Sequence, residues 1–167
     1  MYRGTWNETA VAVKKLEGIE EVMRIEGAAA GRQLLLDLNA EAGLMASMRH
    51  PNIVGFMGLC VDPPCIITEY CERGSLTDVL RAGKRDAAAA AELTWPRRLG
   101  MALEAATGMH HLHSQSPPII HRDLKSPNLL VDAHWHVKVR GGGAGLGRRQ
   151  AGAGEWLGGY PGGAERP

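Results

Sequence analysis

The sequence at residues 121–128 reads His121-Arg122-Asp123-Leu124-Lys125-Ser126-Pro127-Asn128. It matches the pattern His-Arg-Asp-Leu-x-x-x-Asn at every fixed position, and chance is a poor explanation for that agreement. The pattern predicts a loop with a defined chemical role. The simpler interpretation, in which these polar side chains only stabilise a loop, stays open for the activity of this chain.

This stretch, with the Leu129-Leu130-Val131 that follows it, resembles the catalytic loop of eukaryotic protein kinases. The sequence of this stretch is most similar to that of the tyrosine-kinase-like group of serine/threonine kinases, which includes the Raf-like kinases. The resemblance implies that Asp123 accepts the proton of an attacking hydroxyl group. It also implies that Lys125, the serine/threonine form of this position, contacts the transferred phosphate and that Asn128 binds Mg²⁺.

Two features of the first fifty residues occur in the order that this resemblance requires. Val11-Ala12-Val13-Lys14 resembles the strand whose lysine contacts the α- and β-phosphates of ATP, which implies that role for Lys14. Glu41 lies nine residues before His50-Pro51-Asn52, where the family places the glutamate that pairs with this lysine. The alternative for Glu41 is a solvated glutamate on the surface of a helix.

A third stretch, Ile66-Ile67-Thr68-Glu69-Tyr70-Cys71, resembles the strand and hinge that hold the adenine ring. In that frame Thr68 is the gatekeeper, and backbone groups of Glu69 and Cys71 face the purine. The resemblance therefore implies ATP and Mg²⁺ as cofactors.

The pattern of apolar residues predicts strands with one helix inserted, followed by mainly helical structure. The resemblance implies an α+β fold of the protein-kinase type, in which a partial small lobe, made of an antiparallel sheet and one helix, is followed by the first helices and the catalytic loop of the large lobe. We expect a small lobe and hinge over residues 1–74, the start of a large lobe over 75–139 and a disordered glycine-rich tail over 140–167. Apolar residues at helical spacing form a stripe that needs a partner: Leu99, Leu103, Ala106, Met109 and Leu112.

The chain departs from the family pattern at both ends. No Gly-x-Gly-x-x-Gly loop precedes the lysine strand, and Gly141 occupies the position of the aspartate that binds Mg²⁺ in the family. Half of the 22 glycines lie in residues 140–167, and this abrupt change favours a reading-frame or splice-boundary change after Val139. We therefore expect a truncated kinase domain without catalytic activity of its own. With its stripe uncovered, we expect the chain to have low solubility or to depend on a partner.

Composition limits the alternatives. The formal charge of +1 supplies no general field for nucleic acid or anionic lipid, and the tail lacks the repeated Arg-Gly-Gly units of RNA-binding segments. No apolar run is long enough to cross a membrane and no signal peptide is present, so we expect a cytoplasmic protein. Three cysteines suit reduced thiols, and neither they nor His110, His111 and His113 have the spacing of a metal site.

Two functions stay open. The first is ATP-dependent transfer of a phosphoryl group to protein serine or threonine, with a protein substrate or a partner kinase. The second is a non-catalytic, kinase-like binding module that contacts a partner through the unfinished face of the large lobe. The sequence indicates no oligomeric state.

Overall fold

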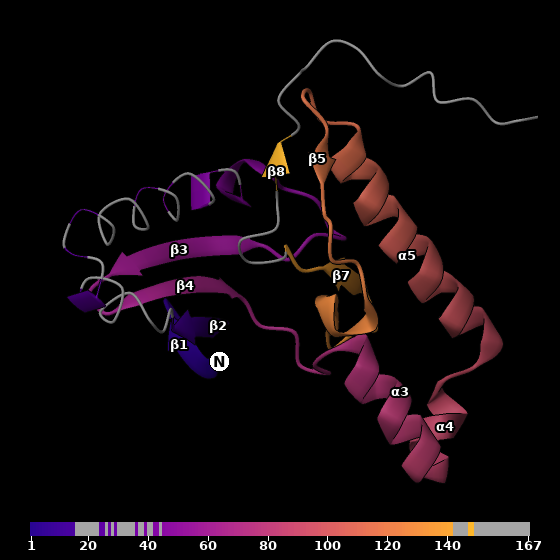
Figure 1. Cartoon of the computed structure of the whole chain (residues 1–167). Coiled ribbons are helices and arrows are strands. Elements are labelled where there is room, and N and C mark those ends of the chain that lie inside the picture. Colours follow the sequence, from indigo (N-terminus) through magenta and orange to yellow (C-terminus); the bar gives the residue numbers. More distant parts are fainter. Residues whose placement is uncertain are drawn as a thin grey trace, which may run out of the picture.

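The computed structural model describes residues 1–15, 45–141 and 147–148, together with residues 24, 25, 27, 29, 36, 39, 42 and 43. Four antiparallel strands form its main sheet in the order β1-β2-β4-β3 (Figure 1). Their bounds are β1 Tyr2–Trp6, β2 Thr9–Lys15, β3 Phe56–Val61 and β4 Pro64–Glu69. The expected antiparallel sheet of a small lobe is confirmed.

A tight turn joins β1 to β2 because both of its central residues accept left-handed backbone angles. Asn7 has φ 45° and Glu8 has φ 64°, as a two-residue hairpin turn with the twist of the flanking strands requires. The register then pairs Trp6 with Thr9 and Tyr2 with Val13. Lys14 is paired with Ile66 on the neighbouring strand β4 and therefore lies in the middle of the sheet.

Three helices lie on the other side of the molecule (Figure 1), namely α3 Leu76–Arg85, α4 Ala87–Glu92 and α5 Trp95–His113. Each begins at a residue whose side chain accepts a hydrogen bond from the first turn. Ser75 and Asp78 form a reciprocal capping box, Asp86 caps α4, and Thr94 accepts from the backbone of Arg97. Each of the three helices therefore has a side-chain cap at its N-terminus.

Short elements connect the helices to the sheet. They are β5 Ile119–Ile120, a 3-10 turn at Ser126–Asn128, β6 Leu129–Val131, β7 Val137–Val139 and β8 Gly147–Arg148. Strand β6 pairs with β7, and the Val54 amide donates to the Val139 carbonyl oxygen at 3.0 Å. Strand β7 is therefore hydrogen-bonded to the segment that leads into β3 and connects it to the helical part of the molecule.

Two apolar clusters form the core. Both include valines of β6 or β7 that have 0% of their surface exposed. The first cluster contains Met48, Ile53, Leu112, Ile119 and Val139, and the second contains Val79, Leu93, Met101, Val131 and Val137. Because α5 supplies a residue to each cluster, its packing against β7 holds both clusters together.

The apolar stripe of α5 is only partly covered. Leu99 is 59% exposed and Leu103 is 67% exposed, whereas Leu112 is 1% exposed. One face of the helix packs against β7 along its length, through Met101 and Glu104 at Val137 and through Leu112 beside Val139, and Leu99 and Leu103 lie outside this contact. The predicted uncovered apolar patch is therefore present in the first half of α5.

Several predicted features fall on residues outside the described ones. They include Glu41 and half of the predicted helix Gln33–Met48, of which the described residues 36, 39, 42, 43 and 45–47 are helical. Most of the tail also lies outside the described residues, although Gly147–Arg148 pairs with β5. Regular structure thus continues past Val139, further than the sequence suggested. Within the described part of the chain, none of the helices combines the length and the apolar character that crossing a membrane requires.

Candidate functional site

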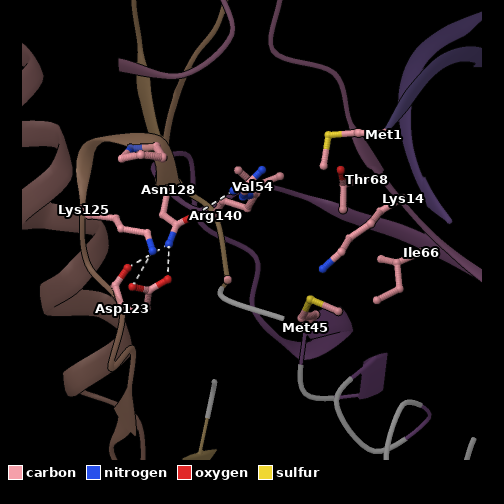
Figure 2. Close-up of a pocket in the computed structure, with 12 residues that line it drawn as sticks. Met1, Lys14, Met45, Val54, Ile66, Thr68, Asp123, Lys125, Asn128 and Arg140 are labelled. Atoms are coloured by element: carbon pink, nitrogen blue, oxygen red, sulfur yellow. Dashed lines mark hydrogen bonds and ion pairs between the residues drawn. The ribbon is translucent and has the colours of Figure 1, made fainter. Parts of the chain in front are cut away.

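A cavity of about 350 Å³ lies between the sheet and residues 121–128 (Figure 2). Five residues predicted from the sequence contribute to its lining: Lys14, Thr68, Asp123, Lys125 and Asn128. Ile66 and Val54 give it apolar walls, and Arg140 and Gly141 complete the side nearest to Asn128. The structure thus brings together, around one cavity, residues that are more than a hundred positions apart in the sequence.

Asp123 is the centre of the polar contacts in the loop. Its Oδ1 lies 2.9 Å from Lys125 Nζ, and its Oδ2 accepts a 2.8 Å hydrogen bond from Asn128 Nδ2. The same Nδ2 also donates to the Asp123 carbonyl oxygen at 2.8 Å. Asn128 therefore holds both the backbone and the carboxylate of Asp123 in place.

These contacts set the charge of the carboxylate. The hydrogen bond from Lys125, followed by that from Asn128, holds the pKa of Asp123 below its usual range. Asp123 is thus an anion near neutral pH and can accept a hydrogen bond from a hydroxyl group. Its side chain is half exposed, so it is accessible from the cavity.

His121 is a buried side chain that forms hydrogen bonds with the backbone of the loop and of Arg140. It is 1% exposed, and its Nδ1 accepts a 3.2 Å hydrogen bond from the Asp123 amide. Its Nε2 lies 2.9 Å from the Arg140 carbonyl oxygen, which only accepts hydrogen bonds. The proton of the neutral ring is accordingly on Nε2, and the imidazole joins the loop to the backbone of Arg140.

Arg140 makes two further contacts with the loop. Its backbone amide donates to the Asn128 carbonyl oxygen at 2.8 Å. Its guanidinium Nη2 donates to Asn128 Oδ1 at 2.7 Å. Asn128, which is 4% exposed, therefore has both ends of its side-chain amide bonded to protein groups.

The sheet supplies the opposite side of the cavity. The amine of Lys14 points from β2 toward the side where Asp123 and Lys125 lie (Figure 2). Lys14 forms no ion pair with any residue that the structure describes. Its predicted partner, Glu41, lies outside the described residues, so the Lys14–Glu41 pair stays a prediction.

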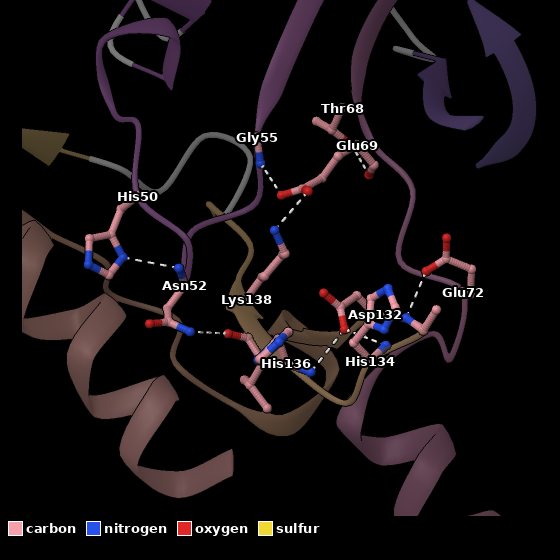
Figure 3. A network of polar contacts seen from close by, with 12 residues as sticks. His50, Asn52, Gly55, Thr68, Glu69, Glu72, Asp132, His134, His136 and Lys138 are labelled. Carbon is pink, nitrogen blue, oxygen red and sulfur yellow. Dashed lines mark hydrogen bonds and ion pairs between the residues drawn. The ribbon is translucent and has the colours of Figure 1, made fainter. Parts of the chain in front are cut away.

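Glu69 and Cys71 do not line the cavity with their side chains. The Glu69 carboxylate accepts a 2.6 Å hydrogen bond from the Gly55 amide and lies 2.9 Å from Lys138 Nζ (Figure 3). Burial, reinforced by the charge of Glu69, raises the pKa of the Cys71 thiol to about 12, so this thiol is unreactive at neutral pH. The predicted contribution of both residues through their backbone groups stays a prediction.

The sequence did not single out Arg140, Lys138 or Glu104 as site residues. Lys138 joins β7 to the end of β4, and Glu104 of α5 accepts a 2.6 Å hydrogen bond from the Val137 amide. None of these three residues belongs to a short sequence motif from which its contacts could be predicted. The one available signal was the position of Arg140, directly before the residue where the family has its aspartate.

The groups around Asn128 include few of the oxygen ligands that a divalent cation requires. Among the described residues, no three His, Cys, Asp or Glu side chains come together as a metal site would need. Asp123 is the only carboxylate among the described lining residues, and Gly141 has no side chain. These residues, with Arg140 bonded to Asn128 Oδ1, do not fit Mg²⁺.

The chain is similar to known protein kinases. It is 45% identical over 141 residues to the probable serine/threonine-protein kinase drkD of Dictyostelium discoideum, covering 83% of this chain and 10% of that protein. It is 45% identical over 141 residues to the probable serine/threonine-protein kinase SIS8 of Arabidopsis thaliana, covering 83% and 12%. The serine/threonine-protein kinase CTR1 of Arabidopsis thaliana is 42% identical over 149 residues, covering 83% and 16%.

The chain therefore spans less than a fifth of the length of these relatives. A family model described as protein tyrosine and serine/threonine kinase matches residues 1–152. The match extends thirteen positions past Val139, into the glycine-rich tail. With the fold and the loop at residues 121–128, it establishes that the chain belongs to the protein tyrosine and serine/threonine kinase family.

Proposed function

We propose that the cavity binds a nucleoside triphosphate and that this chain by itself transfers the terminal phosphoryl group slowly or not at all. One observation carries the proposal: Lys14 and Thr68 of the sheet face Asp123 and Lys125 of the loop across a single cavity. In kinases this is the arrangement that places the phosphates between a lysine and the catalytic loop. The apolar wall at Val54 and Ile66 suits the purine.

Catalysis is the weaker part of this site. Phosphoryl transfer depends on positive charge placed around the transferred group. In the family, Mg²⁺ supplies much of this charge, and an aspartate binds the Mg²⁺. Gly141 removes that carboxylate, while Asp123 keeps the position and charge of a hydroxyl acceptor. If the chain transfers phosphate, we propose serine or threonine of a protein as the acceptor, with Asp123 as the base and Lys125 on the phosphate.

A second function is favoured by the uncovered face of α5. An apolar groove of about 630 Å³ lies between α3 and α5 and includes Leu80, Leu93, Met101 and Met109. Exposed apolar surface of this kind is typical of a contact site for another protein. A kinase-like binding module in the cytoplasm, with residues 1–74 and 75–139 as its two lobes, is therefore the alternative.

One pair of measurements separates these functions. Calorimetric titration of the full chain with ATP measures binding, and incorporation of labelled phosphate into serine/threonine peptides measures transfer. Binding without transfer supports the proposal, and transfer that Asp123→Asn abolishes would replace it with an active kinase. The absence of ATP binding, with or without Mg²⁺, would refute the proposed nucleotide site.

A further inference from the structure

Arg140 occupies the place where a metal ion would contact the catalytic loop. Its guanidinium lies 2.7 Å from Asn128 Oδ1, the oxygen that the family resemblance assigns to Mg²⁺. The other end of the same amide donates to the Asp123 carboxylate at 2.8 Å. A divalent cation could reach this oxygen only by displacing a positive group that already binds it.

The position of Arg140 is fixed by its backbone. The Arg140 amide donates to the Asn128 carbonyl oxygen at 2.8 Å, and the Arg140 carbonyl oxygen accepts from His121 Nε2 at 2.9 Å. His121 is 1% exposed and Asn128 is 4% exposed, so both anchors belong to the packed part of the molecule. The guanidinium is therefore held at the edge of the cavity by three separate hydrogen bonds of the same residue.

The charges of the cavity favour an anion. Lys14, Lys125 and Arg140 contribute three positive groups to the described lining, and Asp123 contributes one negative group. Asp123 is paired with Lys125 at 2.9 Å, which leaves the charges of Lys14 and Arg140 uncompensated by carboxylates of the described lining. Arginine presents five N–H donors in a plane, and its geometry matches two oxygens of a phosphate group.

Resting on the nucleotide site proposed above, we propose that Arg140 takes over the role of the divalent cation and that the cavity binds the phosphates of a nucleoside triphosphate without Mg²⁺. Arg140 contacts the phosphates with the N–H groups that Asn128 does not use, and Lys14 contacts them from the sheet. Mg²⁺ then brings no gain in affinity, because its coordination would neutralise the phosphate charge that the two side chains recognise.

The test compares the affinity of the full chain for ATP in EDTA and in excess MgCl₂, measured by calorimetry. We expect binding in EDTA to be at least as tight as binding in MgCl₂. Binding that requires MgCl₂ would overturn this inference and leave the proposed nucleotide site intact. No binding in either buffer would refute the nucleotide site itself and, with it, the role of Arg140.

Variants then identify the residue responsible. Arg140→Ala should weaken ATP binding in EDTA by about tenfold or more, because it removes a charged hydrogen-bond donor. Arg140→Lys keeps the charge and should lose less. The matched control is Arg85→Ala, which removes an exposed arginine of α3 outside the cavity and should leave the affinity unchanged. Equal losses in Arg140→Ala and Arg85→Ala would overturn the inference, and thermal melting of each variant verifies that it is folded.

Discussion

Gly108 allows α5 to approach the backbone that precedes β3, and replacing it with alanine tests that packing. A Cβ at position 108 would clash with the Asn52 carbonyl oxygen and would lie 2.9 Å from Val139 Cγ2. The Asn52 oxygen cannot move freely, because it accepts a 2.8 Å hydrogen bond from the Val139 amide. Gly108→Ala therefore forces either a shift of the helix or the loss of this hydrogen bond.

The expected size of the effect follows from two opposing terms. Alanine is favoured over glycine inside a helix by about 1 kcal/mol. Overpacking typically costs about 1–3 kcal/mol, and the loss of the backbone hydrogen bond adds about 1 kcal/mol. We expect the free energy of unfolding to fall by about 1–3 kcal/mol in total.

Urea unfolding followed by far-ultraviolet circular dichroism measures this change, with Gly100→Ala as the matched control. Gly100 is in the same helix, and a Cβ there would meet no atom within 4 Å. Gly100→Ala should therefore stabilise the chain by about 0.5–1 kcal/mol. A Gly108→Ala variant as stable as the wild type would refute the close approach of α5 to Asn52.

Three further predictions concern charge and exposure. Glu104, 2.8 Å from His136, raises the pKa of this histidine, so the stabilisation is present below pH 6.5 and is lost as pH rises through the raised pKa. Between acidic and alkaline pH, the free energy of unfolding should therefore decrease by up to about 1 kcal/mol because of this pair, and His136→Gln should abolish that part of the decrease. Urea titrations at several pH values measure it, and the same pH profile in the variant as in the wild type would contradict the prediction. Glu69→Gln leaves Lys138 with an uncompensated charge, and the free energy of unfolding should fall by about 1–3 kcal/mol. Adding Lys138→Met should recover part of that loss, and a double variant less stable than Glu69→Gln would contradict the ion pair. Leu103→Lys should reduce light scattering by self-association while changing the unfolding free energy by less than about 0.5 kcal/mol, since Leu103 is 67% exposed; unchanged scattering would contradict the role of this patch.

The sequence predicts those features that depend on nearby residues. The catalytic loop is encoded within eight positions, and the structure places Asp123, Lys125 and Asn128 of this loop around one cavity. The hairpin turn at Asn7 and the cap at Ser75 also depend only on neighbouring residues. The predicted helix is present as α5, but its buried residues are Met101, Gly108 and Leu112, because helical spacing alone does not tell which face of the helix meets β7. The burial of Leu112 and the exposure of Leu99 follow from that tertiary contact.

The polar contacts around the cavity could not be predicted in the same way. Glu69 and Lys138 are 69 residues apart, and Arg140 and Asn128 are joined by a turn whose path depends on the pairing of β6 with β7. No sequence pattern states that the arginine before a missing aspartate will fold back onto the loop asparagine. Such contacts depend on where the strands place the backbone, which requires the whole fold.

Strand β7 and Arg140 explain why the loop keeps its arrangement although Gly141 lacks a carboxylate. The Val139 amide is bonded to Asn52, Lys138 is paired with Glu69, and the backbone of Arg140 is bonded to His121 and Asn128. All of these contacts come before position 141, so the position of Asp123 does not depend on the side chain at 141. We therefore expect the absence of an aspartate at position 141 to affect the binding of a cation more than the shape of the cavity. Nucleotide binding and phosphoryl transfer can then be lost separately in this chain.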